Sequence, residues 1–219
     1  GAIIESKLEK GRGSVATVLV QKGTLKVGDI FVSGSEWGKV KALINDRGDK
    51  VKIATPSTPV EVLGFDSNPL AGDDFIVLES ENIARKVAEY RFNKKLQKKN
   101  TVNKSNVEEM FEQISLGKAT TMPVIIKADV QGSAEAIENS IIKLSNEEVK
   151  TSVIFKGVGA ITESDVALAN SSKGFIIGFN VRAIPQARDT AKRDGVDIKY
   201  YSIIYELIDD MKNLLGGLL

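Results

Sequence analysis

The sequence predicts two domains of different fold class: an antiparallel β-barrel, then a helical connector, then a four-stranded parallel α/β/α sandwich that ends in a long helix. Three observations predict this architecture. Short runs rich in valine, isoleucine and threonine fill residues 1–80, strand and helix patterns alternate over residues 122–219, and 219 residues suffice for two ordinary domains. The expected boundaries are 1–90 for the barrel, 91–118 for the connector, 119–202 for the α/β/α domain and 203–219 for the terminal helix.

Short strands interrupted by glycine or by Asn/Asp turns are expected throughout the first domain. They are Ser14–Val20, Asp29–Val32, Val40–Ile44, Val51–Ala54, Val60–Leu63 and Phe75–Leu78. Strands this short and this regularly interrupted favour a closed antiparallel barrel. Residues 55–59 include two prolines, which cannot donate ladder hydrogen bonds, so this segment is not expected in a central strand.

The apolar period changes to that of a helix over residues 82–117. Ile83, Val87 and Tyr90 stand at helical spacing, and a capping box at Ser105 and Glu108 starts a second helix. Residues 91–118 contain seven basic and three acidic residues, so positive charge gathers there although the whole chain carries only +1. The polar stretch between the two helices, residues 99–104, is therefore expected to be a solvated, flexible connector.

Strands and helices alternate in the second domain. Strands are expected at Pro123–Ala128, Val149–Phe155, Gly174–Phe179 and Val196–Tyr200, with helices at Ser133–Leu144, from Thr162 onward and at Pro185–Arg193. Repeated βα units imply a parallel sheet covered by helices on both faces. A last helix, Ile204–Leu215, carries an apolar stripe that includes Leu207 and Met211.

The composition excludes several kinds of chemistry. The chain contains no cysteine and no histidine, which rules out disulfides, thiolate metal sites and Ser-His-Asp triads. Adjacent carboxylates such as Asp209 and Asp210 do not share a helix face, so they do not form a persuasive acid/base pair. No apolar run is long enough to span a membrane. We therefore expect no catalytic residue, no metal ligand and no cofactor in this chain, a cytoplasmic location and no membrane partner.

Two short motifs in the second domain partly match nucleotide-binding motifs. Asp129-Val130-Gln131-Gly132 matches a DxxG element, but no phosphate loop accompanies it. Gly157-Val158-Gly159 lies between a strand and a helix, but the third glycine of a dinucleotide fingerprint is missing. Glycines also serve tight strand-to-helix turns. A nucleotide-dependent enzyme with its site near Asp129, Gly132, Gly157 and Gly159 stays open as the alternative.

Basic residues in the first domain indicate a possible RNA contact. They lie in a glycine-flanked loop, on one face of a strand and across the following hairpin: Lys10, Arg12, Lys39, Lys41, Arg47, Lys50 and Lys52. Cations on a barrel edge can follow an RNA backbone. The competing interpretation is an ordinary mixed surface, because residues 1–90 carry a net charge of −1.

Long collinear segments resemble one protein family. Lys10–Gly13, Ala16–Gln21 and Gly23–Asp29 look like the second domain of translational GTPases, while Gly34–Val40 and Pro56–Val62 are similar to bacterial-type translation initiation factor two. In the second domain the matching segments are Val124–Ser133, Gly157–Asp165 and Tyr200–Tyr205. The resemblance covers nearly the whole chain.

The resemblance implies a place within a longer factor. In this family a GTP-binding domain precedes the barrel, and a long helix leads from the α/β domain to a barrel that binds initiator tRNA. The chain is then a central fragment, without GTPase activity of its own, and residues 203–219 start the long helix. GTP and Mg²⁺ are implied for the parent protein only.

The resemblance also implies partners and a mechanical role. The barrel is expected to dock as a monomer on the small ribosomal subunit, against ribosomal RNA, beside the adjoining GTPase and tRNA-binding domains. The α/β domain is expected to relay the GTP state toward initiator-tRNA placement and subunit joining, or to be a spacer without a ligand. Such a relay needs a hinge and a lever, for which the candidates are Lys99, Lys104, Ile204, Leu207 and Met211.

Overall fold

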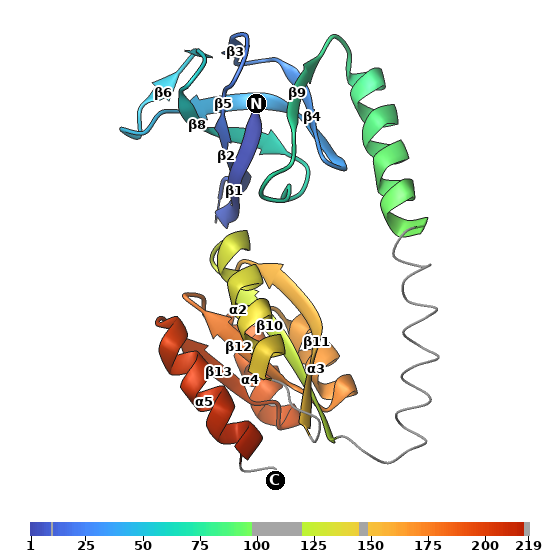
Figure 1. The fold of residues 1–219 in the computed structure, drawn as a ribbon, viewed down its shortest axis with the longest axis vertical. Coiled ribbons are helices and arrows are strands. Elements are labelled where there is room, and N and C mark those ends of the chain that lie inside the picture. Colours follow the sequence, from blue (N-terminus) through green and yellow to red (C-terminus); the bar gives the residue numbers. More distant parts are fainter. Residues whose placement is uncertain (10, 98–119, 145–148, 217–219) are drawn as a thin grey trace. The chain divides into compact units, whose positions relative to one another are not determined.

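The computed structural model describes residues 1–9, 11–97, 120–144 and 149–216. The chain divides into two compact units, Gly1–Asn106 and Val107–Leu219. The first contains an antiparallel sheet and the second a parallel sheet with helices (Figure 1). The predicted fold class is therefore confirmed in both units.

The first unit is a strongly curved antiparallel sheet. Its strands are β1 (Ala2–Glu9), β2 (Gly13–Leu19), β3 (Leu25–Lys26), β4 (Ile30–Ser33), β5 (Glu36–Ile44), β6 (Lys50–Val51), β7 (Ile53–Ala54), β8 (Pro59–Phe65) and β9 (Phe75–Leu78). The main sheet has the order β1-β2-β8-β5-β4-β9, β6 pairs with β5, and β3 pairs with β7 as a separate ribbon.

Hydrogen bonds between the first and last strands close this sheet into a barrel. The Gly1 amino group donates to the Phe75 carbonyl at 2.8 Å, and the Phe75 N–H donates back to the Gly1 carbonyl at 2.9 Å. The interior holds three phenylalanines, with the ring of Phe31 4.5 Å from that of Phe65 and 4.6 Å from that of Phe75. The barrel is thus closed around an aromatic core.

Four details of the barrel differ from the sequence prediction. Strand β1 was not expected, because a register shift between Ile3 and Glu5 breaks its alternation of buried and exposed residues. Strand β3 has only two residues. The strand expected at Val51–Ala54 is divided at Lys52 between β6 and β7. Residues 55–58 lie outside the strands as expected, but Pro59 belongs to β8, which lies between β2 and β5. As the exposed first residue of the strand, Pro59 occupies a position that requires no interior ladder donor.

A helix over residues 81–97 packs on the barrel. Ala84 and Ala88 are buried, and the Arg85 guanidinium lies 5.2 Å from the centre of the Trp37 ring. Arg91 donates to the Gly34 carbonyl at 3.1 Å. Residue 90, the expected end of the barrel domain, therefore lies inside a helix that contacts the barrel on both sides of that position.

The second unit is a four-stranded parallel sheet between two layers of helices. Its elements are β10 (Thr120–Ala128), α2 (Gln131–Leu144), β11 (Val149–Val158), α3 (Glu163–Ser172), β12 (Phe175–Phe179), α4 (Pro185–Asp194), β13 (Ile198–Tyr201) and α5 (Ile204–Gly216). The strand order is β11-β10-β12-β13. Because the chain moves to one side of β10 and then to the other, the sheet has a switch point between β10 and β12.

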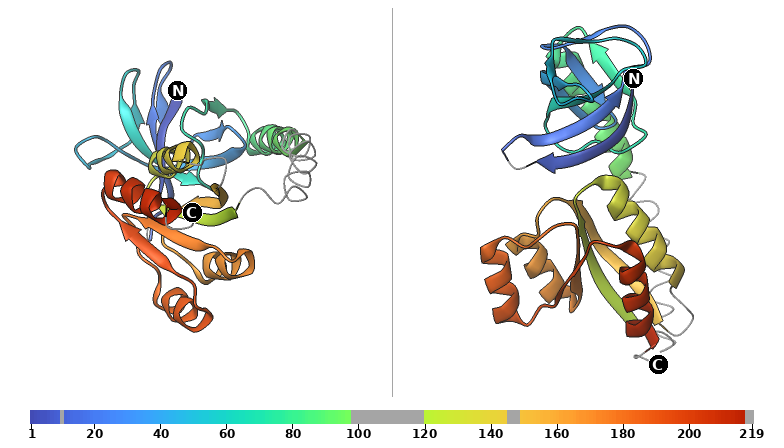
Figure 2. Two further views of the ribbon diagram at one scale, coloured as in Figure 1. Left: turned by 60° about the horizontal axis from the view of Figure 1, so that its bottom comes forward. Right: turned by 90° about the vertical axis from the view of Figure 1, so that its left-hand side faces the viewer.

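Each face of this sheet has its own apolar core. Helices α2 and α5 cover one face, where Ile137, Leu207 and Met211 pack on Val124 and Ile126 of β10. Helices α3 and α4 cover the other face, with a second cluster around Ile125 and Ile176. Figure 2 shows the two layers within this unit.

Candidate nucleic-acid interface

Lys39 and Lys41 lie on the outer face of β5. Both side chains are exposed, whereas Val40 between them points into the barrel core and is 1% exposed. Gly64 of the neighbouring strand β8 makes this arrangement possible at a register shift. Its φ is +124°, and a Cβ atom there would lie 1.9 Å from the Lys39 carbonyl oxygen.

The hairpin that follows β5 carries three more exposed cations. Arg47 stands in its turn, which is fixed because the Asn45 side-chain oxygen accepts the N–H groups of Arg47 at 3.0 Å and of Asp49 at 2.8 Å. Lys50 lies opposite Ile44 in the β5–β6 ladder, and Lys52 follows β6. The structure therefore brings the predicted residues of β5 and of the hairpin together on connected strands.

The fold adds Lys26, which the sequence prediction missed. Strand β3 pairs with β7 so that Lys26 lies opposite Ile53, and the Val27 N–H donates to the Lys52 carbonyl at 3.1 Å. We define the hairpin patch as Lys26, Lys39, Lys41, Arg47, Lys50 and Lys52. Within the part of the chain that the structure describes, all of these side chains are exposed and none forms an ion pair.

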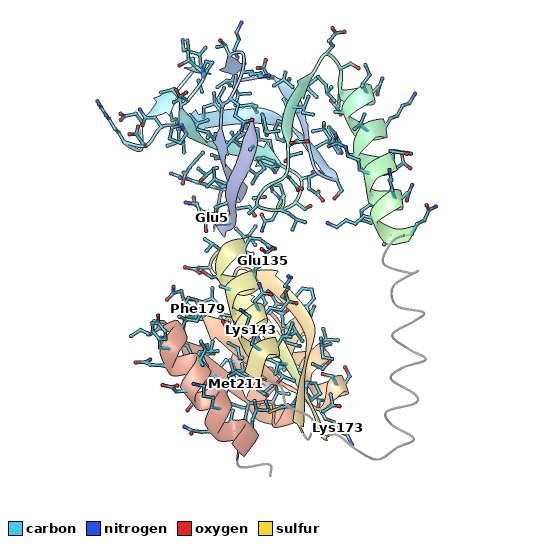
Figure 3. The ribbon with its side chains drawn as sticks, in the orientation of Figure 1. Glu5, Glu135, Lys143, Lys173, Phe179 and Met211 are labelled. Atoms are coloured by element: carbon cyan, nitrogen blue, oxygen red, sulfur yellow. The ribbon has the colours of Figure 1, made fainter. Side chains whose placement is uncertain are left out.

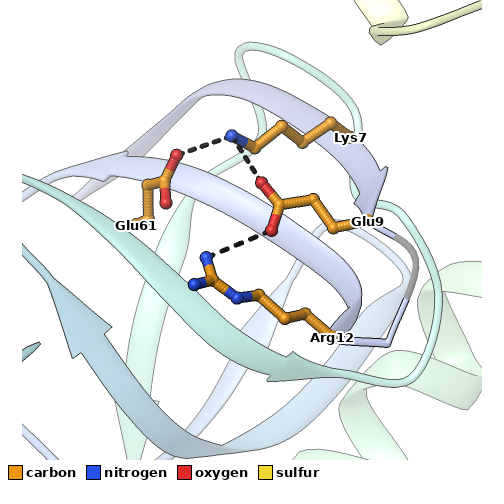
Figure 4. A network of polar contacts seen from close by, with 4 residues as sticks. All are labelled: Lys7, Glu9, Arg12 and Glu61. Atoms are coloured by element: carbon orange, nitrogen blue, oxygen red, sulfur yellow. Dashed lines mark hydrogen bonds and ion pairs between the residues drawn. The ribbon is translucent and has the colours of Figure 1, made fainter. Parts of the chain in front are cut away.

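Arg12, at the β1–β2 turn, differs from the hairpin patch because it forms an ion pair (Figure 4). Its guanidinium lies 3.2 Å from Glu9 Oε2, while Lys7 Nζ lies 2.8 Å from Glu9 Oε1 and 2.7 Å from Glu61 Oε1. The hydrogen bond to Glu61 raises the pKa of Lys7, and the hydrogen bond from Lys7 lowers the pKa of Glu9. Lys10 of this turn lies outside the described residues.

The lever residues of α5 are part of the second unit's core. Leu207 and Met211 are fully buried, and Ile204 is half-buried against the same cluster. Met211, labelled in Figure 3, lies in the layer between α5 and the sheet. Tyr201, the last residue of β13, donates its hydroxyl hydrogen to Asp210 in the middle of α5 at 2.7 Å. Helix α5 is thus fixed to its sheet, and the hinge candidates Lys99 and Lys104 lie outside the described residues.

Hydrogen bonds join the loops at the carboxyl ends of the parallel strands to one another. The Ile161 N–H donates to the Arg182 carbonyl at 3.2 Å, and the Ile184 N–H donates to the Ile161 carbonyl at 3.0 Å. Asn180 also donates to Asp129 at 3.2 Å across the switch point. These bonds join the loops after β11 and β12 past the end of β10, where a nucleotide would bind.

Two further features are absent from the described residues. Among these residues, no group of three or more Asp or Glu side chains is placed to hold a metal ion. No helix among them is both long enough and apolar enough to cross a membrane.

Comparisons with known proteins agree for both units. A family described as translation-initiation factor 2 matches residues 96–212, and one described as elongation factor G domain 2 matches residues 1–78. Proteins named translation initiation factor IF-2 from Rhodospirillum rubrum, Paramagnetospirillum magneticum and Phenylobacterium zucineum are 59%, 56% and 54% identical to the whole chain. The chain spans 25%, 25% and 22% of their lengths, about a quarter.

One solved structure resembles the chain across both units. It is described as GDP-bound aIF5B from Aeropyrum pernix, with a TM-score of 0.54 and 25% sequence identity. The similarity covers 99% of this chain and 36% of that one.

Proposed function

The chain belongs to the translation initiation factor 2 family, and from that premise we propose that it docks on the small ribosomal subunit through its barrel. In this proposal the hairpin patch contacts ribosomal RNA. The α/β unit relays the GTP state of an adjoining GTPase domain toward initiator-tRNA placement and subunit joining. The protein acts in the cytoplasm as a monomer, and its contact with initiator tRNA is indirect.

One observation carries the docking proposal: among the residues that the structure describes, the cations of the hairpin patch are exposed and form no ion pair. A phosphate backbone binds such cations mainly by releasing its condensed counterions. A cation that is already paired with a carboxylate contributes less binding free energy, because the carboxylate repels the incoming phosphate. The patch also spreads over β3, β5, β6 and the turn between β5 and β6, so that neighbouring phosphates can be contacted together.

The rigidity of the second unit supports the relay. Two separate apolar clusters fix helices to both faces of its sheet. Helix α5 contributes Leu207 and Met211 to one of these clusters, and Leu215 of the same helix is also buried. A mechanical relay needs elements that keep their internal arrangement while they move. The lever is then the whole unit with α5 attached.

The same proposal assigns no nucleotide chemistry to this chain. The joined loops at the carboxyl ends of β11 and β12 support this assignment, because they lie where an α/β enzyme binds its nucleotide. GTP and Mg²⁺ then belong to an adjoining domain of the parent protein. A calorimetric titration with GTP tests this point, since submicromolar binding would contradict it.

Cosedimentation with small ribosomal subunits across a salt series tests the docking. We expect binding that weakens as salt rises, and a Lys39→Gln/Lys41→Gln variant that binds about tenfold more weakly with a shallower salt dependence. The matched control is Lys143→Gln/Lys192→Gln, which removes two exposed lysines from the α/β unit. Equal binding by all three proteins would contradict docking through the hairpin patch.

A further inference from the structure

The ribbon formed by β3 and β7 has one face in the barrel core and the other in solvent. Leu25 and Ala54, which pair across the ribbon, are 4% and 2% exposed. Lys26 and Ile53 form the next pair, and Ile53 is 55% exposed. Because residues directly opposite each other in a ladder share a face, Lys26 and Ile53 stand together on the outer side of the ribbon. Val27, the next residue along the chain, is also exposed, at 44%.

Hydrogen bonds fix the backbone that carries these two aliphatic side chains, Val27 and Ile53, which we call the apolar pair. The Val27 N–H donates to the Lys52 carbonyl at 3.1 Å, and the Gly28 N–H donates to the Val40 carbonyl at 2.8 Å. Both side chains of the pair are β-branched, so they have little rotational freedom to lose on binding. The apolar pair is therefore presented to solvent on a rigid support.

Four lysines of the hairpin patch adjoin the apolar pair. Lys26 and Lys52 belong to the ribbon or its immediate end, while Lys39 and Lys41 lie in the part of β5 to which the ribbon is bonded. Among the residues described, these four form no ion pair. Asp29, the acidic residue of the adjoining turn, accepts the Lys26 N–H at 2.8 Å. This surface thus combines exposed aliphatic carbon with lysines that no carboxylate pairs.

That combination favours one class of macromolecule. The core of a protein–protein interface is depleted of lysine, and a protein partner would have to desolvate several unpaired ammonium groups. Single-stranded RNA is held by bases that stack on aromatic rings, and neither the hairpin patch nor the apolar pair includes an aromatic residue. Double-helical RNA instead presents a wide, shallow minor groove in which riboses lie between two rows of phosphates. Aliphatic side chains can pack on these sugars while lysines reach the phosphates.

We propose that the apolar pair packs in the minor groove of an RNA double helix, with the lysines of the hairpin patch on the bordering phosphates. The inference rests on the proposed function and names the form of RNA that the barrel recognises. Ile53 is then a specificity-determining residue, because its contact with the sugars releases no counterions and does not weaken as salt rises. The lysines supply the salt-dependent part of the binding.

Cosedimentation of the full chain with small ribosomal subunits across a salt series separates the two contributions. Ile53→Ala is expected to weaken binding about fivefold at every salt concentration, with an unchanged slope of log affinity against log salt. Ile53→Leu retains the aliphatic volume and should stay within about twofold of the wild type. The matched control is Ile4→Ala: Ile4 is 54% exposed in β1, outside the hairpin patch, and its truncation should change binding less than about twofold.

Competition with short nucleic acids tests the form of RNA. An RNA duplex is expected to displace the chain from small subunits at about threefold lower concentration than a DNA duplex of the same sequence, whose minor groove is narrow and lacks 2′-hydroxyls. It should also compete better than its single strands. The Ile53→Ala chain is expected to lose the preference for duplex RNA over duplex DNA.

Wild-type affinity of Ile53→Ala would overturn the proposal, as would a shallower salt slope for this variant or equal competition by the RNA and DNA duplexes. A loss on intact subunits that is absent on protein-free ribosomal RNA would assign the apolar pair to a ribosomal protein and overturn it too. A failure of docking itself looks different: the Lys39→Gln/Lys41→Gln variant would then bind like the wild type. Circular dichroism confirms that each variant is folded.

Discussion

Lys127 Nζ lies 3.2 Å from Asp165 Oδ2, and these side chains are only 9% and 8% exposed. Asp165 also accepts hydrogen bonds from the N–H and the hydroxyl of Thr162, at 2.8 and 2.9 Å. The pair joins the central strand β10 to the first turn of α3. It therefore fixes the crossover that brings the chain from one side of β10 to the other.

Lys127→Met is expected to destabilise the α/β unit by about 3–5 kcal/mol, because it leaves the Asp165 carboxylate buried without its cation. Hydrogen exchange of the β10 amides measures the change. Lys156→Met is the control: it breaks the more exposed pair with Glu138 and should cost at most about 1 kcal/mol. A Lys127→Met/Asp165→Leu variant should recover much of the lost free energy of unfolding. Equal costs for both lysines would contradict this account.

Gly64→Ala is expected to destabilise the barrel by about 3 kcal/mol or more. The new Cβ would meet the Lys39 carbonyl oxygen at 1.9 Å, and the residue would have to keep a φ of +124°. Urea denaturation followed by the fluorescence of Trp37, the single tryptophan, reports on this unit. Gly23→Ala is the control: its φ is also positive, but no atom lies within 4 Å of the new Cβ. Its cost should be about 1 kcal/mol.

The α/β unit was predictable because its signals are local. Val124–Ala128 is apolar apart from Lys127, and Pro185 and Gly195 mark the start and the end of α4 as their backbone preferences require. Strand β1 was not predictable, because the register shift between Ile3 and Glu5 makes Ile3 and Ser6, three positions apart, its buried residues, whereas a regular strand alternates every second residue. A periodic pattern cannot show a register shift that the partner strand determines.

The candidate site was only partly predictable for the same reason. Lys39 and Lys41 share a strand two positions apart, so the pleat predicts that they share a face. Lys26 joins them only through the pairing of β3 with β7, and the Lys7–Glu9–Arg12 ion pairs extend to Glu61 of β8. Both facts depend on contacts between residues far apart in the sequence, which composition and spacing do not contain.

Ala84→Glu is expected to release the helix of residues 81–97 from the barrel. Ala84 is fully buried against the barrel, so a charged side chain there is neither accommodated nor paired. Release removes Arg85 from the Trp37 ring, 5.2 Å away, and we expect red-shifted emission and faster quenching of Trp37. Glu89→Gln, on an exposed position of the same helix, is the control. Unchanged emission from Ala84→Glu would show that Trp37 does not sense the helix.

The stability of the α/β unit is expected to fall as the pH rises above about 10. Burial, and then the hydrogen bond to Asp210, raise the pKa of Tyr201 well above its ordinary value of 10.0. Above about pH 10 the unfolded chain releases this proton while the folded unit retains it, so unfolding becomes more favourable. Amide exchange at the start of α5, measured from pH 8 to 11 and corrected for intrinsic rates, follows the change.

Tyr201→Phe should lose the Tyr201 contribution to this dependence, because it has no hydroxyl to ionise. Tyr205→Phe is the matched control, since Tyr205 is 75% exposed and its replacement should leave the pH profile unchanged. At acidic pH the sign is opposite for Asp210, whose pKa is lowered first by the Tyr201 hydroxyl and then by Lys199. Its stabilising contribution is present above the unfolded pKa and disappears as the pH falls through the folded one. A Tyr201→Phe profile that matches the wild type at both ends would show that the Tyr201–Asp210 hydrogen bond does not anchor α5.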